Sequence, residues 1–147
     1  MNFTLFTAST RGDTRNVLYP RRRVITGFSD LQTAARFDHV AAEFEGSRRS
    51  LDGFKLADCI VLDVDNDHGQ IVQPEQIAED FPGVAHMVIF SRHHMQPKGS
   101  SGPVPRFHCY FPVAPTADRA ELEQLKRNVC SAFSYFDSNA ADAARFM

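Results

Sequence analysis

A mainly apolar run at residues 57–65 restricts the fold of this chain more than any other feature. The run reads ADCIVLDVD and is rich in β-branched side chains, which favours a buried central strand over a helix. Because side chains alternate across a strand, Asp63 and Asp65 are expected on one face. Two carboxylates at the end of a buried strand repel each other and resist desolvation, so they require a nearby cation. Carboxylate oxygens suit Mg²⁺ or Mn²⁺, so the run predicts either a divalent-metal site or, equally, a strand that ends in a solvated acidic loop.

The remaining segments predict strands and helices in mixed order. Further strands are expected at residues 2–7, 17–19, 23–26, 85–91 and 106–113, the last two as a hairpin. One helix is expected from Ser29, which forms a capping box with Gln32, as far as Gly46. Others are expected at 74–80, at 117–133 after an N-cap at Thr116, and from Ser138 to the end. This order predicts an α+β fold, a mainly antiparallel sheet with helices packed on one face.

Length and composition are those of an ordinary globular chain. Its 147 residues suit a single domain spanning 1–147, and the uncapped final helix suggests a piece of a longer protein. The net charge of −2 provides no overall basic field. Cys59, Cys109 and Cys130 form no CxxC pair, so reduced thiols are expected rather than a zinc site. The sequence shows neither a signal peptide nor a membrane span, which predicts a cytoplasmic protein.

The strand at 106–113 carries a second group of polar side chains. Alternation places Arg106, His108 and Tyr110 on one face and apolar residues on the other. Arginine offers a forked donor and histidine a hydrogen bond, so this face suits a phosphate, although a lone strand histidine is more often structural. Farther along, Asp137 follows two aromatic residues and precedes a helix, where it would serve as an N-cap if it stood alone.

Together these segments resemble the archaeo-eukaryotic primase superfamily, and in closer detail the primase–polymerase domains of phage and plasmid replication proteins. That superfamily has an apolar run ending in DxD or DxE, then a small-x-His motif, then a hydrophobic-Asp motif. The resemblance covers about two-thirds of the chain. It is carried by residues 46–50 (GSRRS), 57–68 (ADCIVLDVDNDH), 91–95 (SRHHM), 105–112 (PRFHCYFP) and 136–146 (FDSNAADAARF).

The resemblance implies an RNA-recognition-motif-like palm and a DNA primase or polymerase activity on single-stranded DNA. Asp63, Asp65 and Asp137 would hold two Mg²⁺ or Mn²⁺ ions, and His108 would contact the phosphates of the incoming NTP or dNTP. Arg106 stands at the small position of the motif and would add a phosphate contact. A fused or associated helicase is the further partner that the resemblance implies, and no membrane is expected.

Several assignments keep alternatives. His93 fits the small-x-His pattern literally but opens a loop, and Asp142 competes with Asp137 for the third carboxylate. Arg48 and Arg49 lie in a Gly–Ser loop before the metal strand, where they either bind triphosphate or template backbone or are solvated surface residues.

Other functions remain open at this point. A toprim-type enzyme also uses DxD after an apolar strand, but its sheet is parallel and it would give the His strand no role. A rolling-circle endonuclease needs paired histidines on one strand, and position 110 here is Tyr110. A degenerate palm that binds single-stranded nucleic acid or nucleotide without catalysis is the non-enzymatic alternative.

Overall fold

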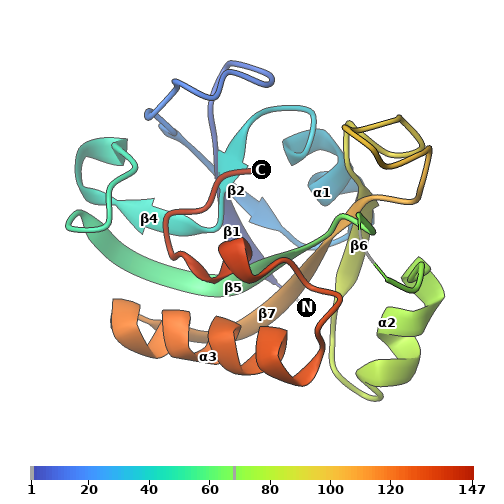
Figure 1. The fold of residues 1–147 in the computed structure, drawn as a ribbon. Helices are drawn as coiled ribbons and strands as arrows, with labels where there is room; N and C mark the ends of the chain where they lie inside the picture. Colours follow the sequence, from blue (N-terminus) through green and yellow to red (C-terminus); the bar gives the residue numbers. More distant parts are fainter. Residues whose placement is uncertain (1, 68) are drawn as a thin grey trace.

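The computed structural model describes residues 2–67 and 69–147, which form two antiparallel sheets and three α-helices (Figure 1). The strands are β1 (Phe3–Thr7), β2 (Arg21–Ile25), β3 (His39–Val40), β4 (Ala42–Phe44), β5 (Phe54–Val64), β6 (Met87–Phe90) and β7 (Phe107–Thr116). The helices are α1 (Phe28–Ala34), α2 (Pro74–Asp80) and α3 (Arg119–Ala132), with 3-10 turns η1 (Glu45–Ser47) and η2 (Ser138–Ala141).

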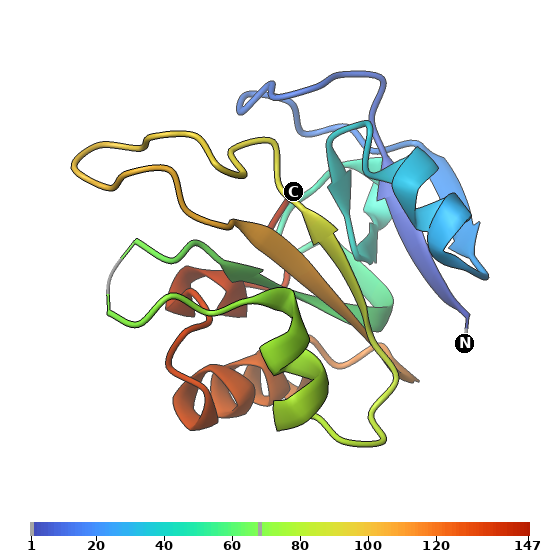
Figure 2. The same cartoon turned by 90° about the vertical axis from the view of Figure 1, so that its right-hand side faces the viewer.

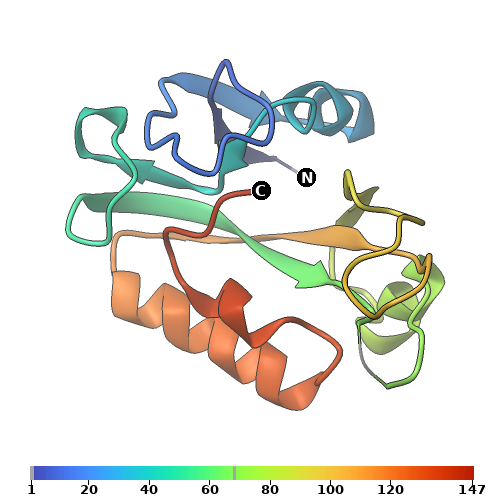
Figure 3. The same ribbon diagram turned by 45° about the horizontal axis from the view of Figure 1, so that its top comes forward.

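The larger sheet has the strand order β4-β5-β7-β6, and the smaller has the order β2-β1-β3. Every described pairing is antiparallel. Helices α2 and α3 lie on one side of the larger sheet, and the smaller sheet with α1 lies on the other (Figure 3). The predicted α+β fold with a mainly antiparallel sheet is therefore confirmed. The second sheet, which carries α1 on itself, was not predicted.

The central strand β5 separates two hydrophobic clusters by simple alternation. Ile60 and Leu62 belong to the cluster under α2 and α3, whereas Cys59 and Val61 belong to the cluster that faces the smaller sheet. Asp63 continues the second series, and its side chain is 5% exposed. The two-residue period of the strand thus directs this carboxylate into the space between the two layers.

The predicted helix from Ser29 to Gly46 is wrong beyond its first two turns. Helix α1 ends at Ala34, its N-cap is Gly27 rather than Ser29, and the following residues form β3 and β4. Val40 pairs with Phe6 of β1, and Ala42 pairs with Ala57 of β5. Partners distant in sequence thus provide the backbone hydrogen bonds that override the weak helical spacing.

The predicted final helix is also wrong. After the short η2 turn the chain is extended, and Phe146 forms an antiparallel bridge with Val40. The backbone N of His39 lies 3.1 Å from the carbonyl oxygen of Met147, and the Met147 N lies 2.9 Å from that of His39. These bonds bring residues 145–147 between the two layers. They satisfy backbone groups that the helix was expected to satisfy internally.

Most of the other predicted elements are found with small shifts at their ends. Helix α2 has the predicted bounds, and β6 and β7 form the predicted hairpin. Helix α3 begins later than expected, because Asp118 rather than Thr116 caps it by accepting from the N–H groups of Ala120 and Glu121. None of the helices in residues 2–67 and 69–147 is both long enough and apolar enough to cross a membrane.

Two long connections leave the same end of the larger sheet. Figure 2 shows the yellow-to-orange loop between β6 and β7 projecting beside the green chain that follows β5. Asp63 and His108 lie at this end, close to where the pairing of β5 with β7 stops.

Candidate functional site

Strand register places the central carboxylate and histidine opposite each other. Asp63 of β5 is paired across the sheet with His108 of β7. The Nδ1 of His108 donates to Oδ1 of Asp63, since an ionised carboxylate can only accept. The contact brings together two residues that the sequence placed on separate strands without predicting that these strands pair.

The second oxygen of Asp63 is held from the C-terminal segment. Nη2 of Arg145 lies 3.1 Å from Asp63 Oδ2 and 3.6 Å from Asp137 Oδ2, so one guanidinium bridges two carboxylates. The backbone N of Asp137 also donates to the carbonyl of Asp63 at 2.9 Å. Asp137 is at the same time the N-cap of η2, since its Oδ1 accepts from the N–H of Asn139 at 2.9 Å. The capping role and the place beside Asp63 are thus compatible.

The electrostatics of this pair favour an ionised carboxylate. Burial raises the pKa of Asp63, but the hydrogen bond and charge of His108 and the guanidinium of Arg145 outweigh burial and lower it. Asp63 is therefore a buried anion that two basic side chains compensate.

The second carboxylate of the DxD motif is compensated in the same manner. Nζ of Lys98, from the loop between β6 and β7, lies 2.9 Å from Asp65 Oδ2 and 3.1 Å from Asp67 Oδ2. The hydrogen bond to Asp65 is the main reason that the pKa of Lys98 is raised. Lys98 therefore ties the long loop to the end of β5.

Arg106 is placed differently from the prediction. Its side chain is 0% exposed, and its Nη2 lies 2.8 Å from Asp67 Oδ1. Its Nη1 donates to the carbonyls of His93 at 3.2 Å and Gln96 at 2.6 Å. Arg106 thus holds the inner side of the long loop and lines neither of the two cavities described below.

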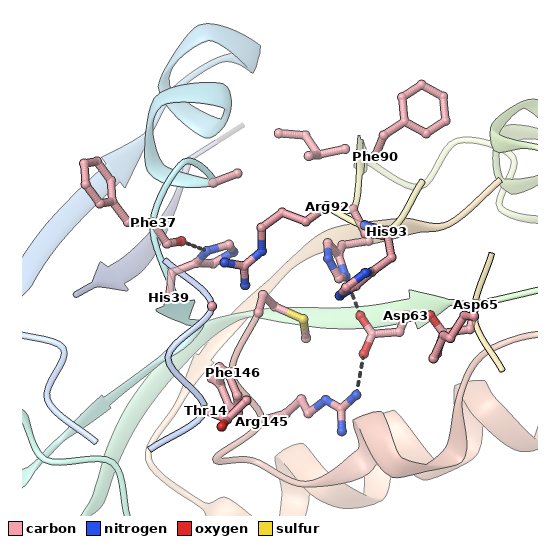
Figure 4. Close-up of a pocket in the computed structure, with 17 residues that line it drawn as sticks. Thr14, Phe37, His39, Asp63, Asp65, Phe90, Arg92, His93, Arg145 and Phe146 are labelled. Atoms are coloured by element: carbon pink, nitrogen blue, oxygen red, sulfur yellow. Dashed lines mark hydrogen bonds and ion pairs between the residues drawn. The ribbon is translucent and has the colours of Figure 1, made fainter. Parts of the chain in front are cut away.

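Two cavities meet along a shared wall made by Asp65, Lys98 and Arg145. The first cavity, of about 500 Å³, is also lined by Asp63 and His108 (Figure 4). The second cavity, of about 520 Å³, also contains Asp137. The predicted residues Asp63, Asp65, Asp137 and His108 are therefore brought together, from three separate segments of the chain.

The positions of the side chains also distinguish between the alternative histidines and between the alternative aspartates. His93 lines the first cavity but is exposed, and His108 alone of the two contacts Asp63. Asp142 lines neither cavity, and its Oδ1 accepts from the N–H of Ala144 at 2.6 Å. The geometry therefore favours His108 over His93 and Asp137 over Asp142.

The arginine pair before β5 lies elsewhere. Arg49 Nη1 donates to the carbonyl of Ala144 at 3.1 Å, and its guanidinium lies 4.8 Å from the ring centre of Phe146. Arg48 is exposed and forms a backbone bridge with Leu18. Neither arginine lines the two cavities, and Arg49 instead supports the C-terminal segment that carries Arg145.

Whether Asp63 and Asp137 can bind a divalent metal depends on the basic side chains that already contact them. Carboxylate oxygens are suitable donors for Mg²⁺ or Mn²⁺. Among residues 2–67 and 69–147, however, no three His, Cys, Asp or Glu side chains are grouped so that they could hold a metal ion. The guanidinium of Arg145 stands as the cation between Asp63 and Asp137. The donor chemistry fits a metal, and an ion shared by these two carboxylates would take the place of the guanidinium.

Sequence reasoning missed the basic half of this site. Arg92, Lys98 and Arg145 all line the first cavity, yet none of them was assigned a role, although Arg92 and Arg145 lie in segments that carry the resemblance. Lys126 of α3 was also missed, because its position in an amphipathic helix suggested nothing unusual. It is 4% exposed and donates to the carbonyl of Asp142 at 2.8 Å.

Comparisons of the chain with protein-family models, with curated proteins and with solved structures found no match. The function must therefore be argued from the geometry of the site.

Proposed function

We propose that this chain is a template-directed nucleotidyltransferase of the primase–polymerase kind, acting on single-stranded DNA with NTPs or dNTPs. The observation that carries the proposal is the meeting of Asp63, Asp65, Asp137 and His108 around two adjoining cavities. These residues come from the three motifs whose order resembles the primase superfamily. Three segments that are unrelated in function would have no reason to place their acidic and histidine side chains around the same cavities.

Asp63, Asp65 and Asp137 are the residues that would hold Mg²⁺ or Mn²⁺. When bound, such ions activate an attacking hydroxyl and stabilise the charge of a leaving pyrophosphate. Arg145 compensates the charges of Asp63 and Asp137, since two buried or half-buried carboxylates side by side would otherwise repel. In this proposal Arg145 releases the carboxylates when the substrate complex enters.

His108 would bind a phosphate oxygen. Asp63 holds Nδ1, which fixes the ring orientation and leaves Nε2 as its second polar atom. A protonated ring beside an ionised carboxylate can donate from Nε2, and this donor suits an anionic phosphate. The first cavity, of about 500 Å³, lies within the range of small-ligand sites.

The direct test is synthesis on a single-stranded template with nucleotides and either Mn²⁺ or Mg²⁺. The variant Asp63→Asn keeps the size of the side chain and removes its charge. Asp52→Asn is the matched control, because the Asp52 side chain is fully exposed and lies outside both cavities. We expect oligonucleotide from the wild type and from Asp52→Asn, and none from Asp63→Asn.

Two results would contradict this proposal in different ways. Undiminished synthesis by Asp63→Asn would remove Asp63 from the catalytic residues. No synthesis by the wild type with either metal, on templates of several sequences, would count against the enzyme as a whole.

A non-catalytic nucleotide or single-stranded nucleic acid binder is the second candidate. It is favoured by the ion pairs, since Asp63 and Asp65 both contact basic side chains. This candidate predicts that fluorescently labelled single-stranded DNA binds equally well in EDTA and in Mn²⁺, without synthesis. The toprim alternative is not proposed, because it requires a parallel sheet and every described pairing is antiparallel.

A further inference from the structure

The proposed function gives no role to an ion pair on the other side of the first cavity. Arg92 follows β6, and its side chain is 49% exposed, whereas the side chain of its partner Asp38 is 0% exposed. Figure 4 shows the guanidinium of Arg92 on the His39 side of the cavity, across from Asp63 and Asp65. Burial of the Asp38 carboxylate is costly unless hydrogen bonds and a cation compensate its charge, so its partners determine what Arg92 can do.

Asp38 is held by the loop that follows β1. Its carboxylate accepts from the backbone N of Gly12 at 2.6 Å, from the backbone N of Asp13 at 3.0 Å and from Thr10 Oγ1 at 3.0 Å. Burial raises the pKa of Asp38, but these bonds together with Arg92 outweigh it and lower the pKa. Asp38 is therefore a fixed anion, and it fixes one end of the arginine.

The loop backbone lies directly against the guanidinium. Gly12 has a φ of +69°, and a Cβ at this position would lie 3.1 Å from Nη1 of Arg92. A side chain here would be strained by the positive φ and would press on the arginine. The absence of a side chain at Gly12 thus lets the loop brace Arg92 closely.

Among residues 2–67 and 69–147, the guanidinium of Arg92 donates to Asp38 alone. The contact with Asp38 involves Nη2 at 3.0 Å, and an arginine carries five N–H donors in a rigid fork. Lys98 and Arg145 also line this cavity, and each is already shared by two carboxylates, whereas Arg92 pairs with Asp38 alone. A multiply charged anion with several acceptor oxygens fits this arrangement better than a neutral ligand.

We propose that Arg92, braced by Asp38 and the residue 10–13 loop, binds the polyphosphate of the nucleotide on the wall opposite Asp63 and Asp65. The choice of ligand rests on the proposed function, whereas the anion site rests on the contacts above. A guanidinium that is already held in place loses little side-chain freedom on binding, which strengthens its contribution to affinity. Asp38 acts only through Arg92 and is a positioning residue.

The experiment measures binding without template and without metal, in EDTA. The probes are inorganic tripolyphosphate, a nucleoside triphosphate and the corresponding nucleoside, titrated by calorimetry. The test variant is Arg92→Gln. The matched control is Arg15→Gln, because Arg15 follows the same loop, its side chain is 94% exposed and it lines neither cavity.

We expect Arg92→Gln to bind both triphosphates about tenfold more weakly, the loss typical of one charge-assisted hydrogen bond. Binding of the nucleoside and of Arg15→Gln should be unchanged. Equal triphosphate affinity of Arg92→Gln and wild type would overturn the inference, as would no tripolyphosphate binding by the wild type. A matching loss for the nucleoside would also overturn it, since it would indicate a purely structural role.

A folding defect is handled with a second variant. Arg92→Lys keeps a charge that can pair with Asp38 but lacks the forked donor, so it should lose part of the triphosphate affinity. If Arg92→Gln does not melt cooperatively, wild-type affinity in Arg92→Lys overturns the inference. Intact triphosphate binding without any synthesis would remove the proposed polymerase function and leave the anion site, so the two failures are distinguishable.

Discussion

His39 provides the sharpest quantitative prediction, because it is a histidine buried between the two layers. It is 2% exposed, and its Nδ1 lies 2.8 Å from the carbonyl oxygen of Phe37. A carbonyl can only accept, so Nδ1 carries the proton, and Nε2 of the neutral ring accepts from the hydroxyl of Tyr110 at 2.8 Å. Protonation of Nε2 would turn this acceptor into a donor and place a charge in an apolar layer.

The consequence is a stability that depends on pH. Burial is the main cause that lowers the pKa of His39 from 6.5 to about 4, and the bond to Phe37 only partly opposes it. The unfolded chain therefore binds a proton at a higher pH than the folded chain. Stability is complete above the unfolded value of 6.5 and is lost as the pH falls toward 4. Between pH 7 and pH 5 this linkage amounts to about 2 kcal/mol of unfolding free energy.

The assay is urea denaturation followed by far-ultraviolet circular dichroism at pH 7 and pH 5, on the wild type and on His39→Gln. Glutamine can reach Tyr110 but does not titrate, so other groups cancel when the two proteins are compared. The wild type should lose about 2 kcal/mol more than the variant over this interval. Equal losses in the two proteins would refute the reasoning that burial keeps His39 neutral.

Three substitutions test the rest of the structure. Arg106→Met should lower the unfolding free energy by about 3 kcal/mol, because it removes three hydrogen bonds of a buried guanidinium, at about 1 kcal/mol each, although Asp67 keeps its contact with Lys98. A loss under about 1 kcal/mol in urea denaturation would contradict this. Lys126→Met should leave the melting temperature at pH 7 unchanged or raise it, because burial lowers the pKa of this lysine to about 8 and methionine removes a charge that is costly to bury. A clearly lower melting temperature would show that the hydrogen bond from Lys126 to the carbonyl of Asp142 outweighs this cost. Arg145→Gln should bind Mn²⁺ severalfold more tightly than the wild type, since the guanidinium no longer competes with the metal ion for Asp63. The affinity is measured by a paramagnetic-resonance titration of free Mn²⁺, and an unchanged value would argue against this competition.

The predictions that succeeded rest on local patterns. The two-residue period within β5 and within β7 separates Asp63 and His108 from the apolar neighbours on their own strands, as predicted, whereas the register between the two strands sets them opposite each other. Helix α2 has a proline at its start and forms as predicted. In each case the local preference and the tertiary environment agree.

The failures concern segments whose pattern is weak and whose partners are far away. Residues 39–44 have helix-like spacing, but pairing with β1 and β5 makes them strands. Residues 138–147 also suggested a helix, and the open edge at His39 turns their last three residues into an extended segment. A short segment satisfies its backbone polar groups wherever partners are available, and the identity of those partners is not local information.

The sequence by itself therefore determined the acidic strand, the strand that carries His108 and the α+β class. The tertiary structure alone decided which cations face those acids. Arg145 reaches Asp63 from 82 positions along the chain, and Arg92 reaches Asp38 from 54 positions away. An ion pair leaves no periodic signal, because it needs only two side chains to meet in space, and the folding of the two layers onto each other is what brings them together.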